Sequence, residues 1–174
     1  MLNRIVLFFV FLGIFSTSFA IGAEVQVSEE ESKIILEQLE TLIGNIDAVG
    51  IFSHNTTLAL PMFIPGFGIA WGAFAAFSTG MAFSVLKDAS PMLANVPSLT
   101  ILFMSPFGLM EVAAYSIAMS RSYMILHKMI KRMPIRPDYH IIGIEIAILV
   151  GLLLTGGFVE YYFIENIPTD SPKI

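Results

Sequence analysis

The chain has 174 residues, of which 56% are hydrophobic and 13% are charged, and its formal net charge is −5. Soluble domains carry about 25% charged residues, so this composition predicts an integral membrane protein, and the length predicts a single domain. The acidic balance argues against nucleic acid as a partner, because binding nucleic acid needs a basic face. The absence of cysteine excludes disulfides, iron–sulfur clusters and thiol nucleophiles.

Residues 1–23, "MLNRIVLFFVFLGIFSTSFAIGA", form the first predicted segment. One basic residue, Arg4, precedes an apolar run that ends in small residues. This pattern is typical of a secretory signal peptide cleaved after Ala20 or Ala23. It is equally typical of a retained anchor, because about 19 apolar residues nearly span the hydrocarbon core. Both alternatives place the following residues outside the cytoplasm.

Residues 24–50 contain seven acidic residues and one lysine. Ser28 and Glu31 have the spacing of a capping box, in which each side chain satisfies a free backbone N–H at the start of a helix. Apolar residues then recur with the period of an amphipathic helix, at Ile35, Leu39, Leu42 and Ile46. This extracytoplasmic helix is predicted either to lie on the rest of the protein or to dock a partner.

Residues 51–164 are predicted to form the membrane bundle, and 165–174 a polar C-terminal tail. The apolar run at 51–86 has the length of two spans around a turn at 65–68. Two further apolar segments follow, at 98–120 and 140–163. With the N-terminal segment, these predict an all-α fold, a polytopic membrane helix bundle with about five hydrophobic segments.

Lysine and arginine predict the orientation of the bundle. Five of the nine lie between Arg121 and Arg136, and cytoplasmic loops are enriched in these residues. We therefore expect a multi-pass protein of the cell membrane, with a cytoplasmic N-terminus and a cytoplasmic loop at 121–139. Residues 24–50 and the C-terminus are expected outside. Because methionine and isoleucine alternate with bases in this loop, it would also suit an interfacial helix on anionic lipid.

Small residues repeat at every fourth position in two of the apolar segments. Such ridges let helix backbones approach closely in a membrane, where packing rather than the hydrophobic effect drives association. They are expected to contact each other or a second copy of the chain. The first ridge consists of Gly68, Gly72, Ala76 and Gly80, and the second of Gly143, Ala147, Gly151 and Thr155.

A helix is predicted to restart at Ser105, within the membrane region. Ser105 and Pro106 suit the N-cap and first positions of a helix, because the hydroxyl accepts a backbone hydrogen bond and proline lacks the N–H that would be unpaired. Gly108 would leave room for a neighbouring backbone. The segment would then be a discontinuous helix near Pro106, a feature that lines ion and substrate sites in transporters.

The carboxylates of the apolar segments are the candidate site residues. An ionised acid in the bilayer is costly, so Glu111 is expected to face the bundle interior and to be bound by Asn55, Tyr115 or free backbone N–H groups. Glu160 either joins Asn55, Glu111 and Tyr115 in one polar cluster or simply reaches the membrane interface. Glu145, near the other end of the last segment, is expected to reach the interface.

No catalytic motif is present, whether nucleophile elbow, phosphate-binding loop, zinc-protease helix or carboxylate–histidine pair. The three histidines, His54, His127 and His140, are far apart and form no metal-ligand pair. We therefore expect no enzymatic activity, no metal and no cofactor.

The chain contains, in order, Asn55 at the head of an apolar hairpin, "STGMAF", "PFGLMEVAA" and a closing "GGFVEYYF". This order resembles the stage II sporulation protein M family of integral membrane proteins, over roughly 51–163. The family's usual histidine between proline and glycine is Phe107 here, which favours a structural role for the following glutamate. The resemblance implies a scaffold that holds partner proteins at a membrane, and it does not imply sporulation. The matching residues are Asn55, Gly72, Gly80, Pro106, Gly108, Glu111 and Glu160.

Two functions remain open. The first is a non-catalytic scaffold or accessory subunit of a membrane complex, with other membrane proteins or a second copy as partners. The small-residue ridges, the acidic helix and Phe107 favour it. The second is a small transporter or channel-like protein that uses Glu111 and Glu160. A continuous water-filled path at Glu111 would favour transport, and a dry, hydrogen-bonded site would favour a scaffold.

Overall fold

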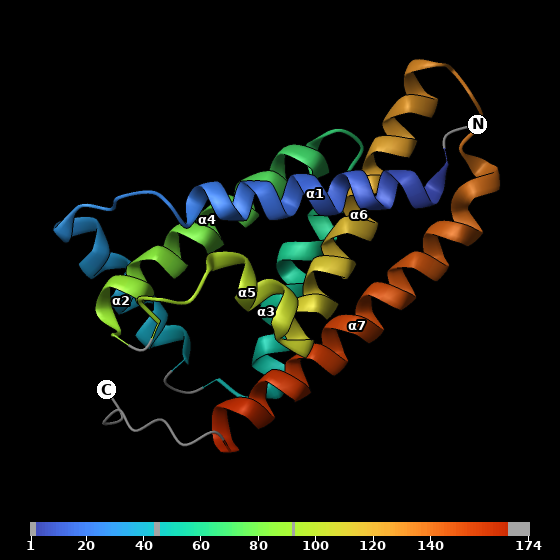
Figure 1. The fold of residues 1–174 in the computed structure, drawn as a ribbon. Coiled ribbons are helices and arrows are strands. Elements are labelled where there is room, and N and C mark those ends of the chain that lie inside the picture. Colours follow the sequence, from blue (N-terminus) through green and yellow to red (C-terminus); the bar gives the residue numbers. More distant parts are fainter. Residues whose placement is uncertain (1–2, 44–45, 92, 167–174) are drawn as a thin grey trace.

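The computed structural model describes residues 3–43, 46–91 and 93–166, and within these it contains seven α-helices, two short 3₁₀ helices and no strand (Figure 1). The prediction of an all-α fold is confirmed. The 3₁₀ helices are η1 (Leu60–Phe63) and η2 (Arg136–Asp138). The α-helices are α1 (Arg4–Gly22), α2 (Glu29–Ile43), α3 (Ala48–Ala59), α4 (Phe67–Ala89), α5 (Ser98–Met104), α6 (Pro106–Ile130) and α7 (Tyr139–Asn166).

Three helices of the described chain are long and apolar enough to cross a membrane: α1, α4, and α7 counted together with η2. A fourth is added if α5 and α6, which are bent by 90° relative to each other, count as one span. The remaining predicted span corresponds to α3, which has 12 residues and is therefore only about 18 Å long. Helices that can cross a membrane are thus present, in a smaller number than the five segments predicted.

The predicted acidic segment at 24–50 contains two helices rather than one. The capping box forms at the start of α2, where the Glu31 N–H donates to Ser28 Oγ at 3.3 Å and the Ser28 N–H to Glu31 Oε2 at 3.4 Å. A second helix, α3, begins at Ala48, because Asp47 accepts a hydrogen bond from the Gly50 N–H at 2.7 Å. The chain therefore enters the bundle three residues before position 51. Of the other predicted features, the Leu42 side chain and residues 167–174 lie outside the described residues.

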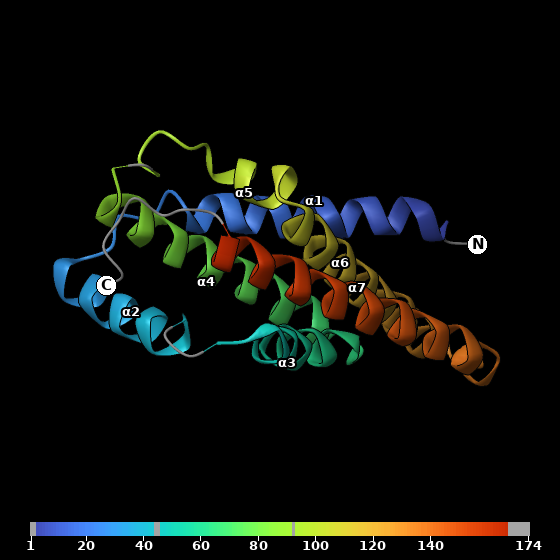
Figure 2. The same ribbon diagram turned by 90° about the horizontal axis from the view of Figure 1, so that it is seen from below.

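The helices form a layer of α4, α6 and α7, with α1 on one side of it and α3 on the other (Figure 2). Two glycines, one on each helix, allow the backbones of α1 and α4 to approach closely. A Cβ on Gly80 would lie 2.0 Å from the Phe19 carbonyl oxygen, and one on Gly22 would lie 2.0 Å from the Phe77 carbonyl oxygen. Any side chain at either glycine would force the two backbones apart.

The first predicted ridge packs along its whole length inside the chain, since all four of its residues are buried. A Cβ on Gly68 would lie 1.9 Å from the Met62 carbonyl oxygen, and one on Gly72 would lie 2.5 Å from Met119 Sδ. The turn before α4 uses Gly66, whose φ of 79° favours glycine. The ridge thus brings η1, α6 and α1 close to α4.

The second predicted ridge faces away from the rest of the described chain. A Cβ on Gly143 or Gly151 would meet nothing within 4 Å, and Ala147 and Thr155 are exposed. The two ridges therefore do not contact each other, and contact with a second copy stays a prediction. The buried face of α7 consists instead of Glu145, Leu149, Leu153, Gly156 and Gly157.

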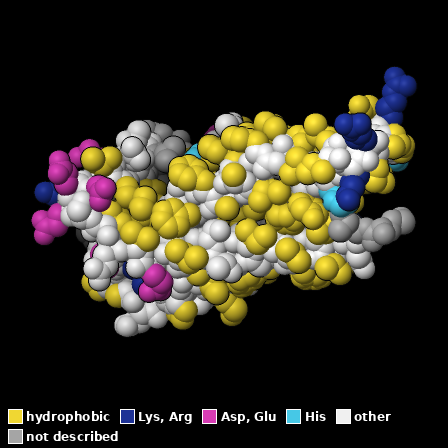
Figure 3. Space-filling model, turned by 90° about the horizontal axis from the view of Figure 1, so that it is seen from above, with side chains coloured by type: hydrophobic (Ala, Val, Ile, Leu, Met, Phe, Trp, Pro, Cys, Tyr) yellow, Lys and Arg dark blue, Asp and Glu magenta, His cyan; other side chains and the backbone are white. Residues whose placement is uncertain are grey.

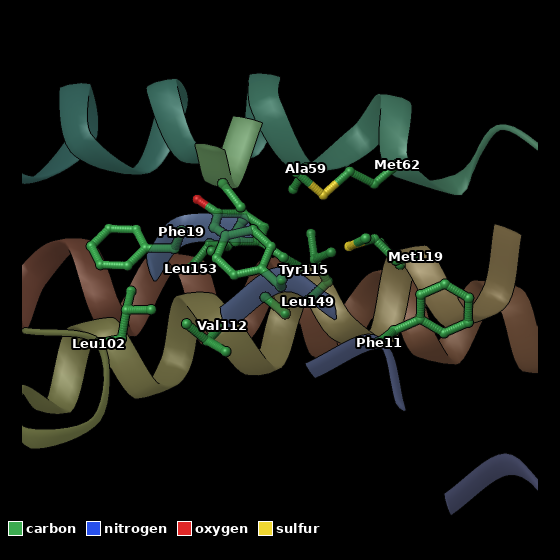
Figure 4. Packing of buried hydrophobic residues seen from close by; sticks show 14 of the residues in the cluster. Phe11, Phe19, Ala59, Met62, Leu102, Val112, Tyr115, Met119, Leu149 and Leu153 are labelled. Carbon is green, nitrogen blue, oxygen red and sulfur yellow. The ribbon is translucent and has the colours of Figure 1, made fainter. Parts of the chain in front are cut away.

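The largest buried side chains fill the middle of the bundle (Figure 4). Met62, Met119, Leu149 and Leu153 are each 0% exposed, so this layer is closed to solvent. It separates the two polar sites described below.

Candidate functional site

A cavity of about 290 Å³ lies inside the bundle and is lined by side chains from all seven α-helices. Most of its wall is apolar, as in small-molecule sites generally. Its polar lining residues are His54, Asn55, Thr79, Glu111, Tyr115 and Glu160. The structure thus places all four members of the predicted polar cluster on one cavity.

Asn55 and Glu111 join two helices that are far apart in sequence. Asn55 lies on the buried face of α3 and is 8% exposed. Its Nδ2 donates to Glu111 Oε1 on α6 at 2.5 Å. Of the three partners expected for Glu111, the structure thus shows the asparagine. Burying a carboxylate that accepts a hydrogen bond costs less free energy than burying one that accepts none.

Tyr115, one turn after Glu111 on α6, does not bind that carboxylate. It is 6% exposed, and its ring packs against Phe15 of α1, with ring centroids 5.2 Å apart. Its hydroxyl oxygen points toward α3 (Figure 4). Among the described residues this hydroxyl has no hydrogen-bond partner, although it lies on the cavity wall.

Glu160 brings a second carboxylate to the same cavity from α7. It is partly buried and makes no hydrogen bond or ion pair with any described residue. Glycine positions this part of α7, because a Cβ on Gly157 would lie 3.0 Å from the Ala48 carbonyl oxygen and 3.2 Å from the Phe52 N–H nitrogen of α3. Gly157 therefore lets α7 pack closely against α3, which places Glu160 on the cavity wall.

The break before α6 has the local structure expected from its sequence. Ser105 Oγ accepts from the Gly108 N–H at 3.1 Å, and Pro106 occupies the first turn. A Cβ on Gly108 would lie 2.7 Å from the Ile101 carbonyl oxygen, so glycine lets the last turn of α5 pack against α6.

The break lies beside the C-terminal part of α7, and its location within the membrane region stays a prediction. Phe107 packs against Phe163 near the end of α7, with ring centroids 6.2 Å apart. A Cβ on Gly156 would lie 3.8 Å from the Phe107 carbonyl oxygen, so α6 begins beside Gly156 of α7, and it runs for 25 residues without interruption. The break turns the chain by 90°, and Glu111 lies in the first half of α6.

A second polar site lies at the other end of the bundle, and it was not predicted. Glu145 accepts two hydrogen bonds from Arg121, from Nε to Oε2 at 2.5 Å and from Nη2 to Oε1 at 2.7 Å. Arg4 Nε binds Glu145 Oε1 at 2.8 Å, and its other nitrogens donate to Ser120 Oγ and the Ile117 carbonyl oxygen. This ion network, Arg4–Glu145–Arg121, joins α1, α6 and α7.

Glu145 is 8% exposed and is paired inside the bundle, and its location at the depth of the membrane interface stays a prediction. Arg121, counted above as part of a cytoplasmic loop, lies inside α6 and is 2% exposed. One feature of the sequence, the acid Glu145 within an apolar helix, indicated such a pair. An acid within an apolar helix must face a partner, because leaving it toward lipid is costly.

The described residues contain no group of three His, Cys, Asp or Glu side chains that could hold a metal ion. The cavity offers hydrogen-bond acceptors and a hydroxyl, which suits the binding of a ligand with N–H donors. No family model, curated protein or solved structure matches the chain.

Proposed function

We propose that the chain is a non-catalytic scaffold or accessory subunit of a membrane protein complex, as its resemblance to the stage II sporulation protein M family implies. Its partners would be other membrane proteins or a second copy. Exposed apolar side chains on α4 and α7 support this proposal, because they can face either lipid or a neighbouring helix. Examples are Phe74, Ile148 and Phe158, which are 60%, 48% and 55% exposed.

The orientation belongs to the same proposal. The exposed acids of α2 and the exposed bases around Lys131, Arg132 and Arg136 lie at opposite ends of the molecule, with apolar surface between them (Figure 3). Basic residues favour the cytoplasmic side. We therefore place the N-terminus and the α6–α7 connection in the cytoplasm, with α2 and the C-terminus outside, in a multi-pass protein of the cell membrane.

Retention of 1–23 is part of the proposal. Phe11, Phe15 and Phe19 of α1 belong to the buried core, and Arg4 belongs to the ion network. Removal of α1 would expose this core and leave Glu145 with one arginine fewer. A role as an anchor that stays in the bundle is therefore favoured over a cleaved signal peptide.

One observation carries the scaffold proposal: the two polar sites are separated by a closed apolar layer. On α7, Glu160 and Glu145 are 15 residues apart, which is about 22 Å along a helix. Leu149 and Leu153 lie between them and are 0% exposed. On α6, Met119 separates Glu111 from Arg121 and is also 0% exposed. Water that enters the cavity therefore meets a hydrophobic barrier, which opposes continuous conduction.

The scaffold proposal is tested by two measurements on the full chain. Purification from native membranes in a mild detergent should yield a fixed set of membrane proteins at constant stoichiometry. Proteoliposomes should leak protons and Na⁺ no faster than those containing the double variant Glu111→Gln/Glu160→Gln. A chain that purifies alone and conducts, with conduction lost in the double variant, would contradict the scaffold.

That contrary outcome would instead support the second candidate, a small transporter. One observation favours it, namely that the two carboxylates share one cavity. Carboxylates inside a membrane protein often mark ion or substrate pathways. A transporter would need the layer around Met119 to open during its cycle.

A further inference from the structure

We propose that the cavity binds a small organic ammonium ion, with the cationic head near Glu111 and Glu160 and the apolar body against the hydrocarbon wall. This assignment goes beyond the proposed function and does not depend on it, because a scaffold subunit and a transporter could both carry such a ligand. It rests on three observations about the cavity.

The first observation is the charge of the cavity. It is lined by two carboxylates and by no lysine or arginine. Glu111 Oε1 accepts from Asn55, while Glu111 Oε2 and both oxygens of Glu160 accept nothing from the described residues. Two acids that share an apolar cavity repel each other and lose hydration. A bound cation would offset both costs.

The second observation is independent of the acids. Tyr115 is 6% exposed, and its hydroxyl lies on the cavity wall with no hydrogen-bond partner in the described chain. Its hydroxyl oxygen is accessible from the cavity and is therefore free to bind a ligand that enters it. The Asn55 side-chain oxygen, in a residue 8% exposed, also accepts nothing from those residues. A ligand with several N–H donors would satisfy both groups together with the carboxylates.

The third observation is the size and character of the wall. About 290 Å³ is much more than a single dehydrated metal ion needs, and no three metal-binding side chains come together in the described residues. The wall is formed largely by apolar side chains, among them Phe15, Ile51, Leu58 and Leu102. Such a wall favours a ligand that has an apolar body as well as a charged head.

The probe for this site is hexylammonium, compared with 1-hexanol and with KCl at the same concentrations. The full chain is purified in a non-ionic detergent, and apparent Kd values come from the ligand-dependent rise in thermal unfolding temperature. We expect hexylammonium to bind at least tenfold more tightly than hexanol. Equal affinity for hexanol, or the same rise with KCl, would overturn the ammonium assignment.

Glu160→Gln is the decisive variant, because Glu160 has no partner whose loss would disturb folding. It should weaken hexylammonium binding about tenfold, or about 1.4 kcal/mol, and leave hexanol binding unchanged. Glu165→Gln is the matched control on the same helix, since Glu165 is exposed and bonded only to Tyr161; it should change neither Kd. An unchanged hexylammonium Kd in Glu160→Gln would overturn the proposal.

A tethered cation gives a second test that does not depend on removing an acid. Thr79 lines the cavity from α4 and is exposed. Thr79→Lys should raise the unfolding temperature and abolish the response to hexylammonium, whereas Thr79→Met should do neither. A Thr79→Lys protein that still responds like wild type would show that the ammonium site lies elsewhere.

Discussion

Glu145 is 8% exposed in a helix that is otherwise strongly apolar, and Arg121, 2% exposed, holds it by two hydrogen bonds. At the scale of single residues, such a buried charge requires a partner of opposite charge, because an unpaired charge costs several kcal/mol away from water. Arg4 from a third helix completes the network. Asn55 has the same role for Glu111 at the other end of the bundle.

The ion network predicts a strong loss of stability when its centre is neutralised. Glu145→Gln leaves Arg121 buried without a counter-ion, and the free energy of unfolding should fall by about 3–5 kcal/mol. The double variant Arg121→Met/Glu145→Leu should recover most of this loss, since apolar side chains of similar volume can replace a buried pair. Denaturation in detergent measures both. Glu145→Gln as stable as wild type would show that the network is not formed.

The Asn55–Glu111 contact predicts a smaller and chemically selective effect. Glu111→Gln retains a side-chain oxygen for the Asn55 N–H and should fold normally. Glu111→Leu leaves that donor unpaired and should lower the free energy of unfolding by about 1–3 kcal/mol. The two variants are compared by thermal unfolding under identical conditions. Equal stability of the leucine variant and wild type would show that Glu111 holds nothing in place.

At the scale of helices, α7 shows how one helix can offer two possible packing faces. Gly143 and Glu145 each begin a series spaced by four, and a shift of two residues turns the face by about 200°. The two series therefore point in nearly opposite directions. The series that begins with Glu145 is buried, because the carboxylate must meet Arg121, and the small-residue ridge consequently faces outward.

This assignment of faces predicts opposite results for two glycine substitutions. Gly80→Leu places a side chain where even a Cβ would lie 2.0 Å from the Phe19 carbonyl oxygen, so α1 and α4 must separate. Overpacking of this kind costs about 1–3 kcal/mol or more. A Cβ on Gly151 would meet nothing within 4 Å, so Gly151→Leu should leave thermal stability in detergent unchanged. Large destabilisation by Gly151→Leu would show that the second ridge packs against a second copy.

At the scale of the whole molecule, charge is divided between the two ends. The acidic helix α2 lies at one end, and the connection between α6 and α7 with its exposed bases lies at the other (Figure 3). The N-terminus and the α6–α7 connection lie at the same end (Figure 1). A membrane normal that passes from one end to the other satisfies the preference of basic residues for the cytoplasm.

The orientation predicts the labelling of single cysteines, which can be placed freely because the chain contains none. Glu37→Cys on α2 should react with an impermeant thiol reagent in intact cells. Lys131→Cys, which is also at an exposed position, should react only after the membrane is permeabilised. Labelling of Lys131→Cys in intact cells together with protection of Glu37→Cys would reverse the proposed orientation.

The sequence by itself determined the helical class, the capping box at Ser28, the N-cap at Ser105 and the turn near Gly66, because caps and turns depend on neighbouring residues alone. It also pointed to the polar residues that meet at the cavity. Tertiary structure decided which face of α7 is buried, that Asn55 rather than Tyr115 binds Glu111, and that Arg121 pairs with Glu145. The reason is physical: a helix that is apolar on all sides has no preferred inner face of its own, so its orientation depends on partners that the fold brings together from distant parts of the chain.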